Sequence, residues 1–297
     1  MEAFAYVAPS SIDEAVAELA KHAKKGHRAQ VLAGGTDLLV QLRGADIEPR
    51  ILVDIKKVAE TNRLHLGKNE IFIGAAIPSA VLNENTELVE LLPGLLEAAD
   101  LIGSTQIQGR ATLGGNLCNA SPAGDTIPAM IAVGVSCVII GGKGQREMPV
   151  EKFVLGVGRN ALKAGEFLVG LKIPRPKSRS ADAYMRFIPR TEMDIAVAGC
   201  GVSVTLDAKG LCKEARVAIG AVAPTAILVP AAARALIGTT LDDAALAAAA
   251  AACSDAASPI TDKRGTIDFR RKVVGVLCRR ATAIARDRAL ARKALGV

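Results

Sequence analysis

Two loops in this sequence place adjacent glycines where main-chain amides can contact a negatively charged ligand. The first loop consists of Val31, Leu32, Ala33, Gly34, Gly35, Thr36, Asp37 and Leu38. An apolar segment precedes the glycine pair and a helix is expected to follow, an arrangement that suits a pyrophosphate, with Thr36 as an additional donor. Asp37 is unfavourable beside phosphate, so we expect it to cap the helix or to order the loop. An ordinary tight turn between a strand and a helix would use the same residues.

The second loop has the same type of chemistry. It contains Ala111, Thr112, Gly114, Gly115 and Asn116, inside a glycine-rich segment, residues 104–122, that we predict to be one long loop. Loops of this length are usually functional or disordered, and the apolar flanks argue against disorder. Asp125 begins the next predicted helix, where it would either cap that helix or bind a ligand hydroxyl. Together the loops favour a ligand with two ends or a long chain that carries phosphate.

A third glycine segment, Gly156–Ala161, has the letters of the dinucleotide fingerprint GxGxxG/A without its context. That fingerprint needs a strand before it, a long helix after it and an acidic residue about 20 positions later. Gly165 would break such a helix, and Pro174 and Pro176 lie where the acid-bearing strand would end. We therefore predict a loop here. A GxxxxGK[ST] phosphate loop is also absent, which argues against nucleoside-triphosphate hydrolysis.

The sequence offers no catalytic or metal-binding constellation of its own. His22 and His27 lie near the end of the first predicted helix, His65 lies in a predicted hairpin, and no Ser/His/Asp elbow or HExxH occurs. The six cysteines include no CxxC pair, so we predict neither a zinc site nor an iron–sulfur cluster. We expect a bound cofactor to do the chemistry. With no signal peptide recognised, free thiols in the cytoplasm are the expectation.

Composition narrows the possible partners. Aromatic residues make up 3% of the 297 residues, which leaves too few stacking platforms for nucleic acid. The net charge of +7 is concentrated between Arg270 and Lys293, where a solvated helix face is the simplest explanation and an acidic partner protein or a nucleotide is the alternative. The longest apolar stretch, Ile127–Gly142, is shorter than the ~20 residues that span a bilayer, so we predict no transmembrane segment.

The hydrophobic pattern predicts a three-part α+β scaffold for the loops. Residues 1–56 are typical of a β-α-β unit, and residues 57–176 mix hairpins, strands and helices. Pro174 and Pro176 mark a boundary, after which residues 177–297 show three strands, with the alternation of an antiparallel sheet, and three alanine-rich helices. We predict one domain over residues 1–176, divided into subdomains 1–56 and 57–176, and a second over residues 177–297.

With these motifs in place, the sequence resembles the flavin-binding (medium) subunits of molybdenum hydroxylases, such as aerobic carbon monoxide dehydrogenase and bacterial xanthine dehydrogenase-like enzymes. The resemblance starts in the two glycine loops and continues through residues 119–125 (NASPAGD), 184–196 (YMRFIPRTEMDIA), 219–225 (IGAVAPT) and 268–280 (DFRRKVVGVLCRR). It covers nearly the whole chain. It implies a two-part FAD-binding domain, a small β-α-β part plus a mixed α+β part, and a C-terminal domain of antiparallel sheet and helices.

The resemblance also implies which residues contact FAD. Leu32–Asp37 and Gly114–Asn116 would hold the pyrophosphate, Ile102 would pack against the isoalloxazine, and Asp125 would bind a hydroxyl of the FAD chain. Leu168 and Arg186 occupy further FAD-contact positions, with Arg186 where the eukaryotic enzymes have lysine. Carbon monoxide dehydrogenases have His-Ser in place of Thr36-Asp37, so carbon monoxide is not the favoured substrate. The cysteine-bearing insertion of the related benzoyl-CoA reductases is absent between Asn116 and Ile140.

By this resemblance the chain is an electron-transfer subunit of an oxidoreductase. A small subunit with [2Fe-2S] clusters would supply electrons, and a large subunit with molybdopterin would oxidise the organic substrate. FAD in this chain would pass the electrons to NAD+, a quinone or oxygen. We expect a cytoplasmic dimer of heterotrimers, at the inner face of the membrane if the acceptor is a quinone. The alternatives are a stand-alone FAD-dependent oxidase of related fold and a cofactor-free scaffold whose glycine loops are only turns.

Overall fold

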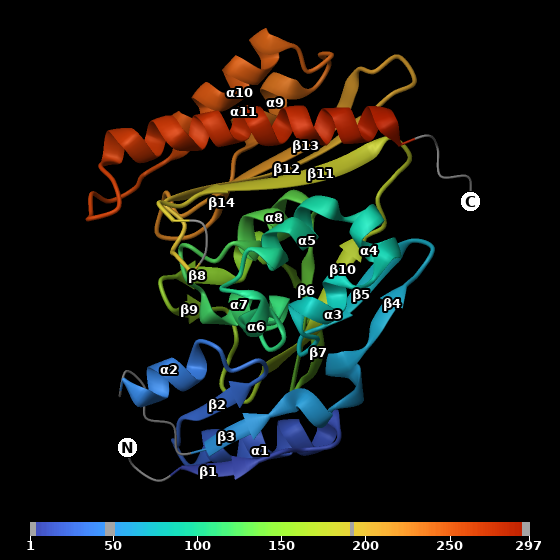
Figure 1. Cartoon of the computed structure of the whole chain (residues 1–297). Coiled ribbons are helices and arrows are strands. Elements are labelled where there is room, and N and C mark those ends of the chain that lie inside the picture. Colours follow the sequence, from blue (N-terminus) through green and yellow to red (C-terminus); the bar gives the residue numbers. More distant parts are fainter. Residues whose placement is uncertain (1–3, 45–50, 191–192, 293–297) are drawn as a thin grey trace.

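The computed structural model describes residues 4–44, 51–190 and 193–292, which form three stacked parts (Figure 1). The N-terminal part is a β-α-β unit, as the sequence predicts, and its sheet is parallel with the strand order β1-β3-β2. Ser11 Oγ caps the first helix by accepting from the Glu14 N–H at 3.2 Å. The elements of this part are β1 (Ala5–Val7), α1 (Ile12–Lys24), β2 (Ala29–Leu32), α2 (Leu38–Arg43) and β3 (Ile51–Asp54).

The middle part is a five-stranded antiparallel sheet in the order β4-β5-β10-β6-β7, with short helices on it. Its sheet strands are β4 (Leu64–Leu66), β5 (Glu70–Gly74), β6 (Ser136–Gly141), β7 (Gly144–Pro149) and β10 (Phe167–Pro174). Its helices are η1 (Ile55–Lys57), η2 (Ala59–Asn62), α3 (Ser79–Asn83), α4 (Thr86–Leu91), α5 (Pro93–Asp100), α6 (Thr105–Gln108), α7 (Leu113–Asn119), α8 (Thr126–Ala132) and η3 (Val150–Lys152).

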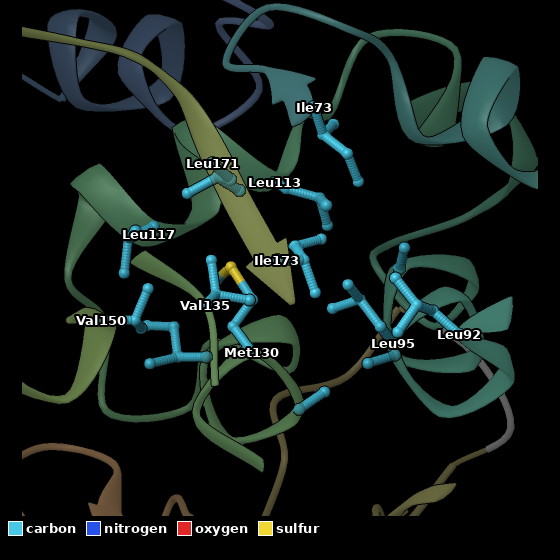
Figure 2. Packing of buried hydrophobic residues seen from close by; sticks show 14 of the residues in the cluster. Ile73, Leu92, Leu95, Leu113, Leu117, Met130, Val135, Val150, Leu171 and Ile173 are labelled. Atoms are coloured by element: carbon cyan, nitrogen blue, oxygen red, sulfur yellow. The ribbon is translucent and has the colours of Figure 1, made fainter. Parts of the chain in front are cut away.

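The prediction of one long loop over residues 104–122 is wrong. Two short helices, α6 and α7, occupy much of it, and Gly114 and Gly115 lie in the first turn of α7. Figure 2 shows how the buried face of α7 packs. Leu113 and Leu117 lie on its buried face among Met130, Leu171 and other buried side chains, so burial of apolar surface stabilises it.

The third glycine segment forms a small hairpin of β8 (Val154–Gly156) and β9 (Arg159–Asn160). The prediction of a loop here is therefore right only for the turn at residues 157 and 158, because the flanking residues pair as strands. The chain then continues into β10 rather than into a long helix.

The C-terminal part is a four-stranded antiparallel sheet in the order β11-β12-β13-β14. The helix α11 covers one face and α5 and α8 of the middle part lie on the other (Figure 1). Its elements are β11 (Ser180–Phe187), β12 (Ala198–Leu206), β13 (Cys212–Gly220), β14 (Ile227–Leu228), α9 (Pro230–Leu236), α10 (Asp243–Ala256) and α11 (Ile267–Ala291). The α+β class is thereby confirmed. Among the described residues no helix is long and apolar enough to cross a membrane.

Candidate functional site

The two glycine loops lie against each other. A Cβ added to Gly34 would stand 2.0 Å from the Arg110 carbonyl oxygen, so only glycine permits this approach of the two main chains. A Cβ on Gly114 would stand 2.6 Å from the Ala75 carbonyl oxygen, so the second loop is also packed too closely on the chain beneath it for a side chain. Gly35 adopts φ +81°, a conformation that favours glycine. The glycines therefore bring two segments about 80 residues apart into contact, at a distance that no side chain permits.

A cavity of about 820 Å³ opens where the two loops meet, which is within the usual size range of a cofactor site. Most of the predicted contact residues line it. These are Val31, Ala33, Gly34, Gly35, Thr36, Asp37, Leu38, Ile102, Ala111, Thr112, Gly114, Gly115, Asn116 and Leu168.

Three predicted contact residues do not line this cavity. Leu32 is buried in a small apolar cluster with Leu38, Leu42 and Leu52, so its side chain supports the first loop from behind. Asp125 and Arg186 instead pair with each other, with 2.7 Å between Arg186 Nη1 and Asp125 Oδ2. The structure therefore brings together the pyrophosphate-loop residues and places the Asp125–Arg186 pair apart from them.

Neither aspartate caps a helix in the way the sequence suggested. Asp37 and Asp125 both occupy the N-cap positions of α2 and α8, but their backbones are already helical and neither side chain makes a cap hydrogen bond. The N-cap geometry needs an extended backbone at that residue, so the carboxylates are directed elsewhere. Partial desolvation raises the pKa of Asp37, whose carboxyl group lies at the cavity wall.

Asp125 is held by two residues of β11. Besides the Arg186 contact, the Tyr184 hydroxyl donates to Asp125 Oδ1 at 2.9 Å. Burial raises the pKa of Asp125 to about 6, although Arg186 and Tyr184 both act to lower it. Arg186 Nε is buried and has no hydrogen-bond partner among the described residues. A buried N–H without a partner is costly, so this donor has capacity for a ligand acceptor.

Several supporting residues were missed in the sequence. Lys56 Nζ donates to the Ala33 carbonyl at 3.1 Å and pairs with Asp54 at 2.7 Å, which fixes the start of the first loop. Lys56 comes shortly after β3 in the sequence, but no sequence pattern indicates that its side chain reaches back to residue 33.

The hairpin β8–β9 also contributes to the site, although its fingerprint letters are misleading. Asn160 Nδ2 donates to the Cys118 carbonyl at 2.8 Å, and the Gly158 N–H donates to the Ala120 carbonyl at 3.0 Å. Gly158 and Asn160 both line the cavity. Gln41 of α2 and Asn119 of α7 close its rim through a hydrogen bond of 2.9 Å. These contacts depend on tertiary proximity, for which the sequence carries no local signal.

Comparisons with known proteins agree with this geometry. Residues 2–176 match the family of FAD binding domains in molybdopterin dehydrogenases, and residues 183–285 match the carbon monoxide dehydrogenase flavoprotein C-terminal domain. The carbon monoxide dehydrogenase medium chain of Afipia carboxidovorans is 32% identical over 96% of this chain and 98% of its own length. The nicotinate dehydrogenase FAD-subunit of Eubacterium barkeri is 34% identical over 71% of this chain and 72% of its own.

Solved structures show the same fold along nearly the whole chain. A carbon monoxide dehydrogenase chain from Hydrogenophaga pseudoflava superposes with a TM-score of 0.91 and 33% identity, over 97% of this chain and 98% of that one. A chain of quinoline 2-oxidoreductase from Pseudomonas putida 86 gives a TM-score of 0.88 at 26% identity, over 97% and 99%. The resemblance seen in the sequence is confirmed, and the chain belongs to the FAD-binding medium subunits of the molybdenum hydroxylase family.

Proposed function

We propose that this chain holds FAD in the cavity between its two glycine loops and transfers electrons within a molybdenum-dependent dehydrogenase. The observation that carries the proposal is the cradle of Gly34, Gly114 and Gly115. The Cβ positions of Gly34 and Gly114 point into neighbouring main chain, and that of Gly115 points to Thr112 Oγ1, so main chain forms this wall of the cavity and leaves room for a diphosphate. Thr36, Thr112 and Asn116 add polar side chains to the same wall.

The rest of the site fits the same cofactor. Ile102 and Leu168 supply apolar lining for a ring system. When bound, FAD would exchange electrons with both one-electron and two-electron partners. The chain's own residues bind and orient it; no group of His, Cys, Asp or Glu among the described residues could hold a metal ion.

The partners follow from the names of the relatives. Several are medium chains or FAD subunits of dehydrogenases, so we propose an iron–sulfur small subunit and a molybdenum large subunit for this chain, assembled as a dimer of heterotrimers. Electrons would enter from the iron–sulfur subunit and leave to NAD+, a quinone or oxygen. All six cysteines are free thiols, which fits a reducing cytoplasm. If the acceptor is a quinone, we propose that the complex lies at the inner face of the membrane.

The proposal is tested by replacing one glycine of the cradle. In Gly34→Ala the new methyl group would collide with the Arg110 carbonyl and separate the loops, so we expect the FAD dissociation constant to rise at least about tenfold. Quenching of flavin fluorescence measures it. Gly142→Ala is the matched control, because a Cβ there meets nothing within 4 Å.

Failure to bind FAD, or equal affinity in Gly34→Ala and the wild type, would reject the cavity as the site. Purification of the native protein distinguishes between the two hypotheses, the proposed complex and the stand-alone oxidase. Co-purification with iron–sulfur and molybdenum subunits is the expected result, and a single chain that oxidises an organic substrate would overturn it.

A further inference from the structure

Tyr184 makes a buried contact that the proposed function does not yet use. It lies on β11 two residues from Arg186, so the two side chains project from the same face of the strand. Both reach the carboxyl group of Asp125, Tyr184 at Oδ1 and Arg186 at Oδ2. The side chains of Asp125 and Arg186 are 10% and 5% exposed, and Tyr184 as a whole is 5% exposed. Each carboxylate oxygen is thereby held by a different residue of the C-terminal part.

Asp125 is linked to the second glycine loop through its neighbour in the chain. The next residue, Thr126, donates from its hydroxyl to Asn116 Oδ1 at 2.7 Å, and Asn116 lines the cavity. Gly124 is packed against the same amide, with its Cβ position 3.1 Å from Asn116 Oδ1. Any shift of Asp125 would therefore move side chains that line the cavity.

The Tyr184 hydroxyl fits in its place because the residue beside it, Gly199, has no side chain. A Cβ on Gly199, in the neighbouring strand β12, would stand 2.6 Å from the hydroxyl oxygen. A phenylalanine at 184 would keep the ring and lose only the oxygen. Tyr184→Phe therefore tests the hydroxyl alone.

We propose that Tyr184 is a positioning residue for the flavin site. By fixing one carboxylate oxygen while Arg186 holds the other, it keeps Asp125 ionised and oriented, so that the C-terminal part controls a segment of the cofactor-binding part. The inference rests on the proposed FAD site. The charged and titratable groups that face Tyr184 or Asp125 are Arg186, Cys200 of β12 and Glu97 of α5, whose carboxylate lies 3.4 Å from the Tyr184 N–H.

The test is the pH dependence of FAD affinity in Tyr184→Phe. The pKa of Asp125 is raised to about 6 and the Tyr184 hydrogen bond lowers it, so loss of the hydroxyl raises that pKa further. We expect the FAD affinity of the wild type to fall as the pH drops through about 6. As the pH drops, the affinity of Tyr184→Phe should begin to fall at a higher pH than that of the wild type. At neutral pH its FAD dissociation constant should be roughly tenfold higher, because a hydrogen bond to a charged group is lost. Fluorescence quenching between about pH 5 and about pH 8 covers both transitions.

Two further variants separate positioning from general stability. Tyr6→Phe removes the only other tyrosine hydroxyl, which donates to Asp54 at 2.7 Å, and it should leave the pH at which affinity falls unchanged. Gly199→Ala displaces the Tyr184 hydroxyl without removing it, so it should shift the pH profile in the same direction as Tyr184→Phe. In the double variant the two effects should not add, because phenylalanine relieves the collision.

The outcomes distinguish this inference from the proposed function. If wild-type protein binds FAD and Tyr184→Phe, folded by circular dichroism, binds it with the same affinity and pH profile, the role of Tyr184 is refuted while the FAD site stands. If Gly199→Ala leaves the profile unchanged, the inference also fails, even where Tyr184→Phe does not fold. Absence of FAD binding in the wild type would instead refute the proposed function.

Discussion

The ion pair of Arg186 and Asp125 gives the molecule a pH-dependent contribution to stability. Burial raises the pKa of Asp125 from 3.8 to about 6 in the folded chain. The folded state therefore binds this proton more tightly than the unfolded state between those two values. The contribution of Asp125 to the free energy of unfolding falls as the pH rises from 3.8 to about 6, and is constant above. Arg186 limits that loss, because its charge favours the ionised carboxylate.

Removal of the guanidinium in Arg186→Met should lower the free energy of unfolding by about 3 kcal/mol at neutral pH, since it leaves a buried carboxylate unpaired. The loss should be smaller near pH 5, where Asp125 takes up a proton. Arg186→Lys keeps the charge and should cost less. Urea denaturation at the two pH values measures the difference. An equal loss in the free energy of unfolding at the two pH values would show that Asp125 does not take up a proton in this range.

These residues also show how far sequence reasoning reaches at this scale. The glycines and threonines of the two loops are adjacent in sequence, and their main-chain chemistry could be read directly. Asp125 and Arg186 are 61 positions apart. Residue type alone left both a helix cap and a ligand contact open for Asp125. The family resemblance singled out both positions, but their mutual pairing, and the Lys56 contact to the first loop, depend on tertiary approach.

At the scale of elements, α7 shows why the second loop was predicted without a helix. Gly114 and Gly115 each disfavour a helix by about 1 kcal/mol relative to alanine, so local propensity indicates a loop. The burial of Leu113 and Leu117, four residues apart on one face, outweighs that cost. Thr112 adds a specific start, because its Oγ1 accepts from the Gly115 N–H at 2.8 Å. Longer elements without glycine, such as α1, could be predicted from their periodicity alone.

Thr112→Ala should therefore destabilise α7 by about 1 kcal/mol, the usual cost of removing an N-cap side chain. Because Thr112 also lines the cavity, FAD affinity should fall as well. Hydrogen exchange of the α7 amides measures the local effect, and Thr112→Ser, which keeps the accepting oxygen, is the control. Unchanged exchange in the alanine variant would show that the cap does not stabilise this helix.

At the scale of the whole molecule, α5 joins the cofactor-binding part to the C-terminal sheet. The Asp182 carboxylate of β11 accepts from the Leu95 N–H at 2.8 Å, in the first turn of α5. Arg288 of α11 forms an ion pair with Glu97 and donates to the Asp182 carbonyl at 3.0 Å. The side chains that hold Asp125 come from the same strand β11. The position of the C-terminal part is therefore coupled to the flavin site through β11, which α5 fixes in place, and through the contacts of α8 with β12 and β13.

The closest approach in this contact is at Gly94, where a Cβ would stand 2.5 Å from the Ala183 backbone nitrogen. Gly94→Ala should push α5 away from β11 and lower the free energy of unfolding by about 2 kcal/mol, since neither main chain can move without disturbing its sheet or core. Tyr184 is the residue after Ala183, so the variant should also weaken FAD binding, although residue 94 does not line the cavity. Thermal unfolding and FAD titration of Gly94→Ala, beside Gly142→Ala, measure the two effects together. A variant that loses stability but keeps wild-type FAD affinity would show that the C-terminal part can shift on α5 without disturbing Asp125.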